Sequence, residues 1–217
     1  GGGGPAPVPS ALVAVPGPPG TGAEATPGGC IHLWVGLSGG GVEVFDAASG
    51  GAVSAFACHG DEALVALAHV PACGVVFALS AHRRVSVWDV ASFACLQKYS
   101  AELMTCGSDL SAMIATRVEE RDICVLMLAG VDGSLCCRRV SRNAEGKLNC
   151  VLAAFIEDAS QEAAPISCLQ HCAELDCVLV GDAGCAVSLL PKLTGQLGAA
   201  VRSQHEQRGP PPPPAAA

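Results

Sequence analysis

Residues 17–22 read "GPPGTG", a glycine-rich stretch of the type that cradles phosphate groups in nucleotide-hydrolysing enzymes. In such a loop, a lysine and a serine or threonine follow the glycines and hold the phosphates and a magnesium ion. Ala23 and Glu24 occupy these two positions, and a carboxylate repels the phosphate that it should help to bind. We therefore interpret this stretch as part of a linker rather than as a nucleotide site.

A second chemical motif lies at residues 36–40, where "GLSGG" fits the G-x-S-x-G pattern of a nucleophilic serine. That pattern works only when a strand precedes the serine and a helix follows it. Residues 41–46 read "GVEVFD", which alternates apolar and polar positions like a strand. We therefore expect Ser38 to be a hairpin turn residue and not a nucleophile.

Cys168, His171, Cys172 and Cys177 form a third group, because thiolate and imidazole are ligands that Zn²⁺ prefers. On a strand, however, Cys168 and Cys172 share one face and His171 points to the other. The C-x₂-C pair of most structural zinc sites is also missing. We expect these to be core cysteines and leave zinc binding open. We predict no catalytic residue, cofactor or metal, and expect that the chain is not an enzyme.

Composition excludes several functional classes. The chain has 217 residues, of which 50% are hydrophobic, and its net charge is −8. An acidic chain lacks the basic face that nucleic acid requires, and no apolar run approaches the ~20 residues that insert into a membrane. The 13 cysteines are scattered through apolar stretches and behave as small hydrophobic residues. We therefore expect a reducing, cytoplasmic location and neither nucleic acid nor membrane insertion.

Low-complexity tails bracket the central part of the sequence. We divide the chain into a linker at 1–29, a repeat-containing segment at 30–202, and a polar and polyproline tail at 203–217. The linker is almost entirely Gly, Pro, Ala and Val, and the tail ends in "GPPPPPAAA". Neither composition buries enough apolar surface to become ordered, so we expect both tails to be disordered.

The central segment contains an internal repeat. Residues 35–56 align with residues 78–99, which lie 43 positions later, and two further copies begin near Cys124 and Cys177. The matched positions are Val42 and Val85, Val44 and Val87, Phe45 and Trp88, Asp46 and Asp89, with turn residues Asp132 and Asp182 in the later copies. Apolar residues recur with a period of two, which is typical of strands. A spacing of about 40–50 residues is that of a four-stranded propeller blade.

Strands can be assigned within each copy. The first copy begins at Ile31 without an inner strand, so the chain holds about three and a half blades. The expected strands are 63–69, 74–80, 85–89 and 94–99 in the second copy, 111–118, 123–129, 134–140 and 147–155 in the third, and 166–171, 177–180, 185–190 and a weak one near 197–201 in the fourth.

Residues 31–201 resemble the WD40-repeat family of β-propellers. The resemblance rests on "VEVFD" at 42–46, "VSVWD" at 85–89 and the turn residues Asp132 and Asp182. His59-Gly60 stands reversed where the family has Gly-His. The resemblance implies an all-β, partial WD40-like β-propeller. We expect the repeat signature to be structural, with aspartates that cap turns; it comprises Phe45, Asp46, Trp88, Asp89, Asp132 and Asp182.

The resemblance further implies a non-catalytic scaffold that binds proteins or peptides through its loops. The chain is then a fragment or domain of a larger regulatory protein. The remaining blades come from missing sequence or from a second chain, or this segment closes as a small irregular propeller. An alternative is the non-catalytic part of an inositol polyphosphate phosphatase, kinase or small-GTPase regulator whose catalytic domain lies elsewhere. The candidate partner contacts are Asp61, Glu62, His82, Arg83, Arg84, Arg138 and Arg139, with the arginines suited to an acidic partner.

Overall fold

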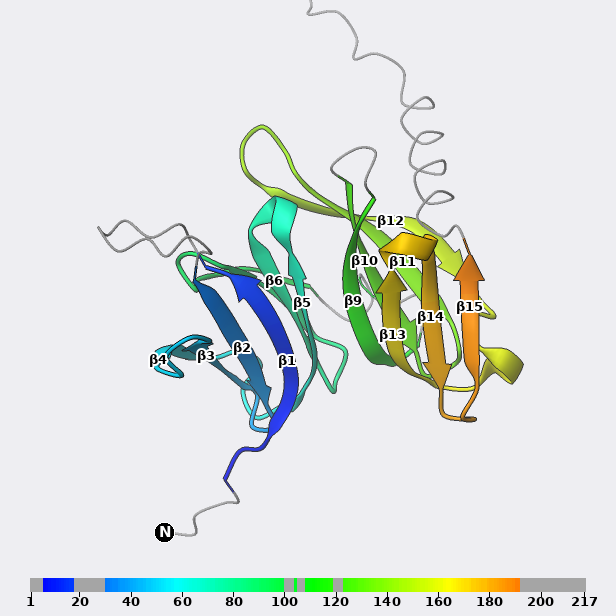
Figure 1. The fold of residues 1–217 in the computed structure, drawn as a ribbon, viewed down its shortest axis with the longest axis horizontal. Helices are drawn as coiled ribbons and strands as arrows, with labels where there is room; N and C mark the ends of the chain where they lie inside the picture. Colours follow the sequence, from blue (N-terminus) through cyan, green and yellow to red (C-terminus); the bar gives the residue numbers. More distant parts are fainter. Residues whose placement is uncertain (1–5, 18–29, 100–103, 105–107, 119–122, 192–217) are drawn as a thin grey trace, which may run out of the picture.

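The computed structural model describes residues 6–17, 30–99, 104, 108–118 and 123–191, and this part of the chain is almost entirely β-structure (Figure 1). Its fifteen strands form four antiparallel sheets, three of four strands and one of three. Each sheet contains strands that follow one another in the sequence. The expected all-β, partial β-propeller is confirmed. In the described residues, no helix has the length and apolar character needed to cross a bilayer.

The first sheet contains a strand that the sequence analysis did not expect. Its strands are β1 (Pro9–Pro16), β2 (Ile31–Leu37), β3 (Gly41–Asp46) and β4 (Ala52–Ala57). β1 pairs with β2 in antiparallel register, with Leu12 opposite Val35. The expectation that the first copy lacks its inner strand is therefore wrong, because part of the Pro- and Gly-rich lead-in supplies that strand.

The alternation of "ALVAV" explains why this segment forms a strand. Val15 is fully buried, and Ala11 and Val13 on the same face pack against the core that lies between the first and second sheets. The intervening Leu12 faces the other way and is exposed. Prolines are confined to the ends, at Pro9 and Pro16, where a missing backbone N–H does not interrupt the ladder.

The second and third sheets agree with the strands expected from the sequence to within two residues at each end. The second sheet has β5 (Leu64–Val70), β6 (Val75–Ser80), β7 (Val85–Asp89) and β8 (Cys95–Tyr99). The third has β9 (Leu110–Val118), β10 (Ile123–Gly130), β11 (Leu135–Arg142) and β12 (Leu148–Ile156). Short 3₁₀ turns follow β5 at η1 (Pro71–Cys73) and β12 at η2 (Gln161–Ala163).

The fourth sheet has three strands within the described residues. They are β13 (Ile166–Cys172), β14 (Cys177–Asp182) and β15 (Val187–Pro191), with the 3₁₀ turn η3 (Ala173–Leu175) between the first two. These correspond to the first three strands expected in the fourth copy. The weak strand expected near 197–201 and the tail at 203–217 lie outside the described residues.

The four sheets follow one another around a common centre. Each inner strand contacts the next, in the order β1, β5, β9 and β13, and these strands lie side by side toward the middle of the molecule (Figure 1). The outer strands lie farther out. This is the radial arrangement of propeller blades.

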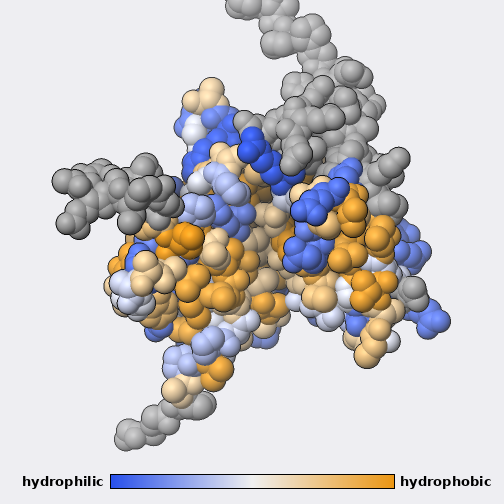
Figure 2. All heavy atoms as spheres, viewed as in Figure 1, coloured by the Kyte–Doolittle hydropathy of each residue, from blue (hydrophilic) through white to orange (hydrophobic). Residues whose placement is uncertain are grey.

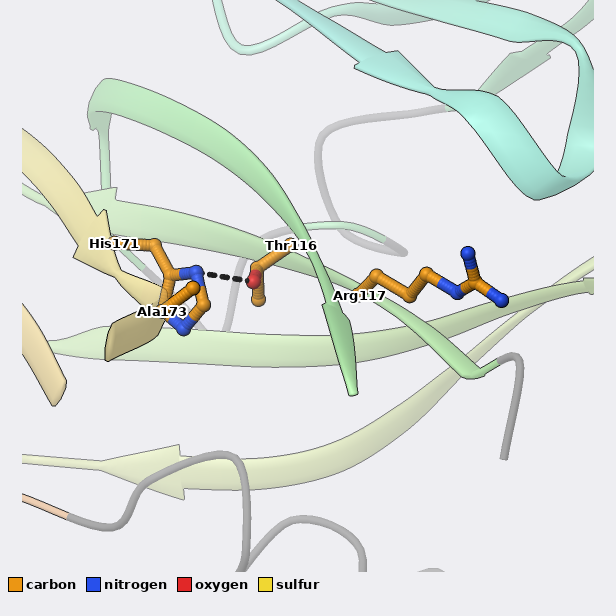
Figure 3. A pocket seen from close by; sticks show the side chains of 4 residues that line it. All are labelled: Thr116, Arg117, His171 and Ala173. Carbon is orange, nitrogen blue, oxygen red and sulfur yellow. Dashed lines mark hydrogen bonds between the residues drawn. The ribbon is translucent and has the colours of Figure 1, made fainter. Parts of the chain in front are cut away.

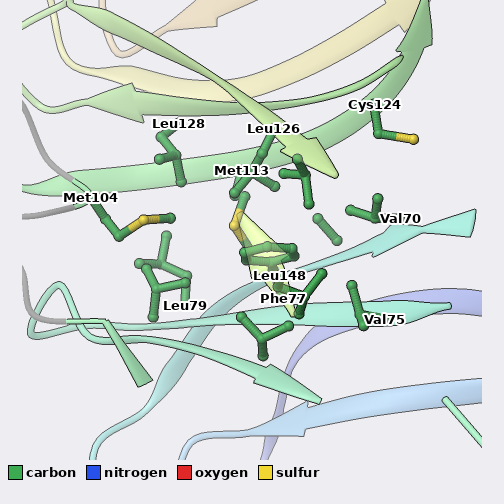
Figure 4. Packing of buried hydrophobic residues seen from close by; sticks show 14 of the residues in the cluster. Val70, Val75, Phe77, Leu79, Met104, Met113, Cys124, Leu126, Leu128 and Leu148 are labelled. Atoms are coloured by element: carbon green, nitrogen blue, oxygen red, sulfur yellow. The ribbon is translucent and has the colours of Figure 1, made fainter. Parts of the chain in front are cut away.

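A separate apolar core fills each of the three junctions between successive sheets. At the second junction, Phe77 and Leu79 of the second sheet share a core with Leu126 and Leu128 of the third, and all four side chains are fully buried (Figure 4). Met104, from the connection between β8 and β9, belongs to the same core. A strand of an inner sheet therefore buries both of its faces, which is why β6 is apolar at nearly every position.

The Val15→Ala variant should lose about 2 kcal/mol of unfolding free energy, because fully burying a valine side chain contributes roughly 1.5–3 kcal/mol. Val8→Ala is the matched control: Val8 precedes the same strand, is 61% exposed, and its change should stay within about 0.5 kcal/mol. Urea unfolding followed by circular dichroism measures both. Equal losses in the two variants would contradict the burial of β1.

Candidate functional site

The repeat-equivalent aspartates at the ends of β3 and β7 cap turns, as predicted. Asp46 Oδ1 accepts hydrogen bonds from the backbone N–H and the hydroxyl of Ser49, both at 2.7 Å. Asp89 Oδ1 accepts the same two bonds from Ser92, both at 2.8 Å. The bonds from Ser49 lower the pKa of Asp46, and at Asp89 the bonds from Ser92 lower the pKa against the opposing effect of burial. Both carboxylates are occupied by structural bonds.

The other two signature aspartates have the same role in the hairpin turns of the third and fourth sheets. Asp132 Oδ1 accepts bonds from the Ser134 hydroxyl at 2.6 Å and from its backbone N–H at 3.1 Å. Asp182 Oδ1 accepts the backbone N–H of Ala186 at 3.0 Å. These carboxylates therefore fix the turns that lead into β11 and β15.

Trp88 anchors a buried hydrogen-bonded chain at the first junction. Its Nε1–H donates to Ser86 Oγ at 2.7 Å, and Ser86 Oγ lies 3.0 Å from His59 Nε2. His59 Nε2 also lies 3.3 Å from the carbonyl oxygen of Ala78. His59 comes from the connection between the first and second sheets, so the chain of bonds ties that connection to β6 and β7. In sequence, His59 was visible only as half of a reversed dipeptide.

The aromatic signature residues differ in their surroundings. Trp88 stacks on Phe56 of β4, with ring centroids 4.3 Å apart. Phe45, the equivalent residue of the first sheet, is half-buried on the face that points away from the second sheet. The two positions match in the repeat, but only Trp88 has a neighbouring sheet over its face in the described structure.

Five of the seven candidate contacts lie near one another at one end of the molecule. We define the hairpin end as residues 60–62, 80–84 and 108–109, from three connections that are distant in sequence. Arg84 Nη1 forms an ion pair with Glu62 Oε1 at 3.0 Å, and Arg83 Nε pairs with Asp109. Ser80 Oγ donates to Glu62 Oε2 at 2.8 Å and so holds the carboxylate in place. Asp61 and His82 complete this group and are exposed.

Arg138 and Arg139 do not join this group, because they lie in the middle of β11. Arg138 Nη2 donates to the carbonyl oxygen of Cys150 at 3.3 Å, and its Nε is buried. Burial raises the pKa of the nearby Tyr99 to about 12. The Arg138 side chain therefore bonds within the third sheet and lies near Tyr99 of β8.

A pocket of about 380 Å³ lies at the opposite end, where β9 and β13 finish (Figure 3). Thr116, Arg117, His171 and Ala173 line it, and Arg117 points away from the other three. Thr116 Oγ1 lies 2.7 Å from His171 Nδ1, which ties the third sheet to the fourth. Sequence reasoning missed Thr116, since its partner lies 55 residues away.

The structure places the residues of the zinc and serine motifs. Cys177 is buried as expected, but Cys168 is exposed and Cys172 is half-buried, so the prediction of core cysteines is wrong for these two. His171 Nδ1 is engaged by Thr116, and nowhere in the described residues do three histidine, cysteine or acidic side chains gather as a metal site. Ser38 lies in the β2–β3 turn, where its hydroxyl accepts the backbone N–H of Val8 at 2.9 Å, and a strand follows it. The prediction of a hairpin turn residue is confirmed. Of the loop at 17–22, only Gly17 lies within the described residues.

Comparison with known proteins supports the fold. No family model and no curated protein matches the chain, so membership of the WD40 family stays a prediction. Among solved structures, the computationally designed Ika4 protein aligns with a TM-score of 0.54 and 14% identity over 87% of this chain and 93% of that one. BBS1N in complex with ARL6DN aligns with a TM-score of 0.60 and 12% identity over 86% of this chain and 52% of that one. The designed Ika8 protein aligns with a TM-score of 0.52 and 15% identity over 84% of this chain and 45% of that one.

Because the sequence identities are low, the similarity to these three structures establishes only the fold. BBS1N is a β-propeller, and the four sheets of this chain superpose on part of it. The chain spans about half the length of BBS1N and of Ika8, and nearly the whole length of Ika4.

Replacing His59 by glutamine should weaken the pH dependence of stability. Burial lowers the pKa of His59 below its ordinary value of 6.5, so below that pH the unfolded chain binds more protons than the folded one. The contribution of His59 to the unfolding free energy is therefore complete above pH 6.5 and is lost as the pH falls toward the lowered pKa.

Urea unfolding of wild type and His59→Gln at pH 7 and pH 5 measures this effect. Burial also lowers the pKa of His69, which therefore contributes in the same direction. His69→Gln is the companion variant, and the double variant should show the smallest change in unfolding free energy between pH 7 and pH 5. If His59→Gln kept the whole wild-type difference between the two pH values, His59 would not be buried in its neutral form.

Proposed function

We propose that this chain is a non-catalytic protein-interaction module that binds an acidic segment of a partner at the hairpin end. The observation that carries the proposal is the backbone of Arg83, whose φ is +64°. This left-handed conformation costs roughly 1–2 kcal/mol for a residue with a side chain.

The equivalent turn positions in the other sheets show what the local structure prefers. Gly40 and Gly133 occupy the same place in the β2–β3 and β10–β11 turns, with φ of +75° and +80°. Cys185 is the equivalent residue of the fourth sheet, at φ +62°. Glycine accepts this conformation without steric cost. An arginine at such a position lowers stability, and a functional role for its guanidinium is the compensation that we infer.

The ion pairs at the hairpin end are weak enough for carboxylates of a partner to replace the chain's own acidic residues. Arg83 and Asp109 are 39% and 50% exposed, and exposed pairs contribute only about 0–1 kcal/mol. A carboxylate of the partner therefore displaces Asp109 at little cost. Arg84 is more exposed still, while its anchor Glu62 is mostly buried and held by Ser80. The guanidinium group of Arg84 is therefore held in position before a partner binds, which reduces the entropy lost on binding.

The comparisons are compatible with this role. BBS1N was solved in complex with another protein, ARL6DN, so a structural neighbour uses this fold with a protein partner. The thirteen scattered cysteines favour a reducing, cytoplasmic setting. The same interaction role fits the alternative in which the chain is the non-catalytic part of a multidomain enzyme or exchange factor.

The Arg83→Gly variant tests the proposal, because it should separate stability from binding. The variant relieves the left-handed strain and loses one exposed ion pair, so its unfolding free energy should equal or exceed that of wild type. Its affinity for an acidic probe should fall about tenfold or more, since a hydrogen bond to a charged group contributes roughly 1.5–3 kcal/mol.

The probe is a fluorescein-labelled decapeptide of alternating glutamate and glycine, and anisotropy is read at low and high salt. Cys185→Gly is the matched control: it relieves the same strain in the fourth sheet and should bind like wild type. The proposal fails if wild type does not bind the peptide, or if Arg83→Gly binds it as well as wild type does.

A further inference from the structure

Each of the three observed junctions joins two different faces. The forward face of a sheet packs on the following sheet, and the backward face packs on the preceding one. In the second sheet, Phe77 and Leu79 lie on the forward face, while Val76, Ala78 and Trp88 lie on the backward face. The same relation repeats from the first sheet to the fourth, so the contact is head-to-tail.

The backward face of the first sheet has no sheet over it in the described structure. Leu12, Ile31 and Val53 are 65%, 47% and 43% exposed there. They surround half-buried apolar side chains of β2 and β3, namely Leu33, Val35, Leu37 and Phe45. Figure 2 shows apolar residues gathered over this sheet, where β1 and β2 lie in Figure 1.

The forward face of the fourth sheet is the other face that no sheet covers within the described residues. Val187 and Leu189 of β15 are 69% and 53% exposed. Cross-strand pairing places Leu179 beside Leu189, and Gly181 beside Val187. Orange, apolar residues are again visible over β14 and β15 (Figure 2). Exposed apolar faces of this extent mark contact surfaces.

We propose that a second copy of this chain covers both faces. The forward face of each fourth sheet packs on the backward face of the other copy's first sheet, and a two-fold axis relates the copies. The two copies close a ring of eight sheets, which is within the four to eight blades of closed propellers. The inference concerns assembly and does not rest on the proposed binding function.

The packing of the chain's own sheets indicates that a second copy covers the two exposed faces. Forward and backward faces of this chain already pack on each other three times, so the chain contains both halves of the required contact. Closure within one copy would need the first and fourth sheets to meet, and among the described residues no apolar core joins them. The same arrangement occupies about half of BBS1N and of Ika8, while Ika4 shows that a chain of this length folds.

The area is sufficient for a stable contact. Strands about 4.8 Å apart, with five residues at about 3.4 Å each, give a four-stranded face of roughly 300 Å². Each junction joins one such face to the three-stranded face of the fourth sheet, which is roughly 250 Å². Two junctions therefore bury on the order of 1,100 Å², above the roughly 1,000 Å² expected of a specific interface. Glu43 is the one acidic side chain among the described residues of these faces. Its burial opposes association, so Glu43→Ser should tighten the dimer.

Light scattering after size exclusion, in 150 mM NaCl and from about 1 to 100 μM chain, tests the proposal. Wild type should reach twice the 21.7 kDa of one chain. Leu12→Asp blocks the backward face and Leu189→Asp blocks the forward face, so each alone should be monomeric. Leu96→Asp is the matched control: Leu96 is exposed on β8, away from both faces, and its dimer should persist.

Mixing the two blocked variants gives the sharpest result. A mixed pair retains one junction with both faces intact, which is half of the contact area of the wild-type dimer. The equimolar mixture should therefore associate more strongly than either variant alone and more weakly than wild type. That recovery also shows that both variants are folded. A wild-type chain of single mass at all concentrations would overturn the proposal and favour further blades from other sequence. Failure of the mixture to associate would equally overturn the head-to-tail geometry.

Discussion

Burial of both faces of every sheet is the constraint on which this structure depends. A four-stranded antiparallel sheet with one apolar face needs only one neighbouring sheet to bury that face. The inner sheets of this chain are apolar on both faces. β6 illustrates this, because all six of its residues are buried. Each sheet therefore needs a neighbour before it and another after it, and the chain arranges its sheets radially to supply them. The polar bonds serve this packing: Ser86 and His59 tie the first junction, and Thr116 and His171 tie the third.

Much of the fold is readable from sequence because strand alternation is local. The strand expected at 85–89 is β7 to the residue, and turn aspartates such as Asp89 bond as the repeat predicted. β1 was missed because its composition matches a linker, and its partner β2 begins only after fourteen further residues. What makes it a strand is the apolar core that it meets, and local composition does not contain that information.

The candidate site was only partly predictable for a related reason. Pairs of charged residues were visible in the loops, and two connections do bring Glu62 and Arg84 together, with Arg83 beside them. The pairing of Arg83 with Asp109 and its left-handed backbone depend on tertiary placement and turn geometry. Arg138 shows the converse: it was predicted to contact a partner, but it lies within β11 and its side chain bonds to the neighbouring strand β12.

Both tryptophans lie at one junction, so tryptophan fluorescence monitors only that part of the molecule. Trp34 and Trp88 are the only tryptophans of the sequence, and both belong to the core between the first and second sheets. Indole emission therefore reports the solvation of that one junction, while far-ultraviolet dichroism reports all four sheets. Chains built from stacked units lose cooperativity when one interface is weaker than the others. Superposition of the two melting curves would mean that the sheets unfold as a single unit, and a gap between them would measure the independence of the first sheet from the rest.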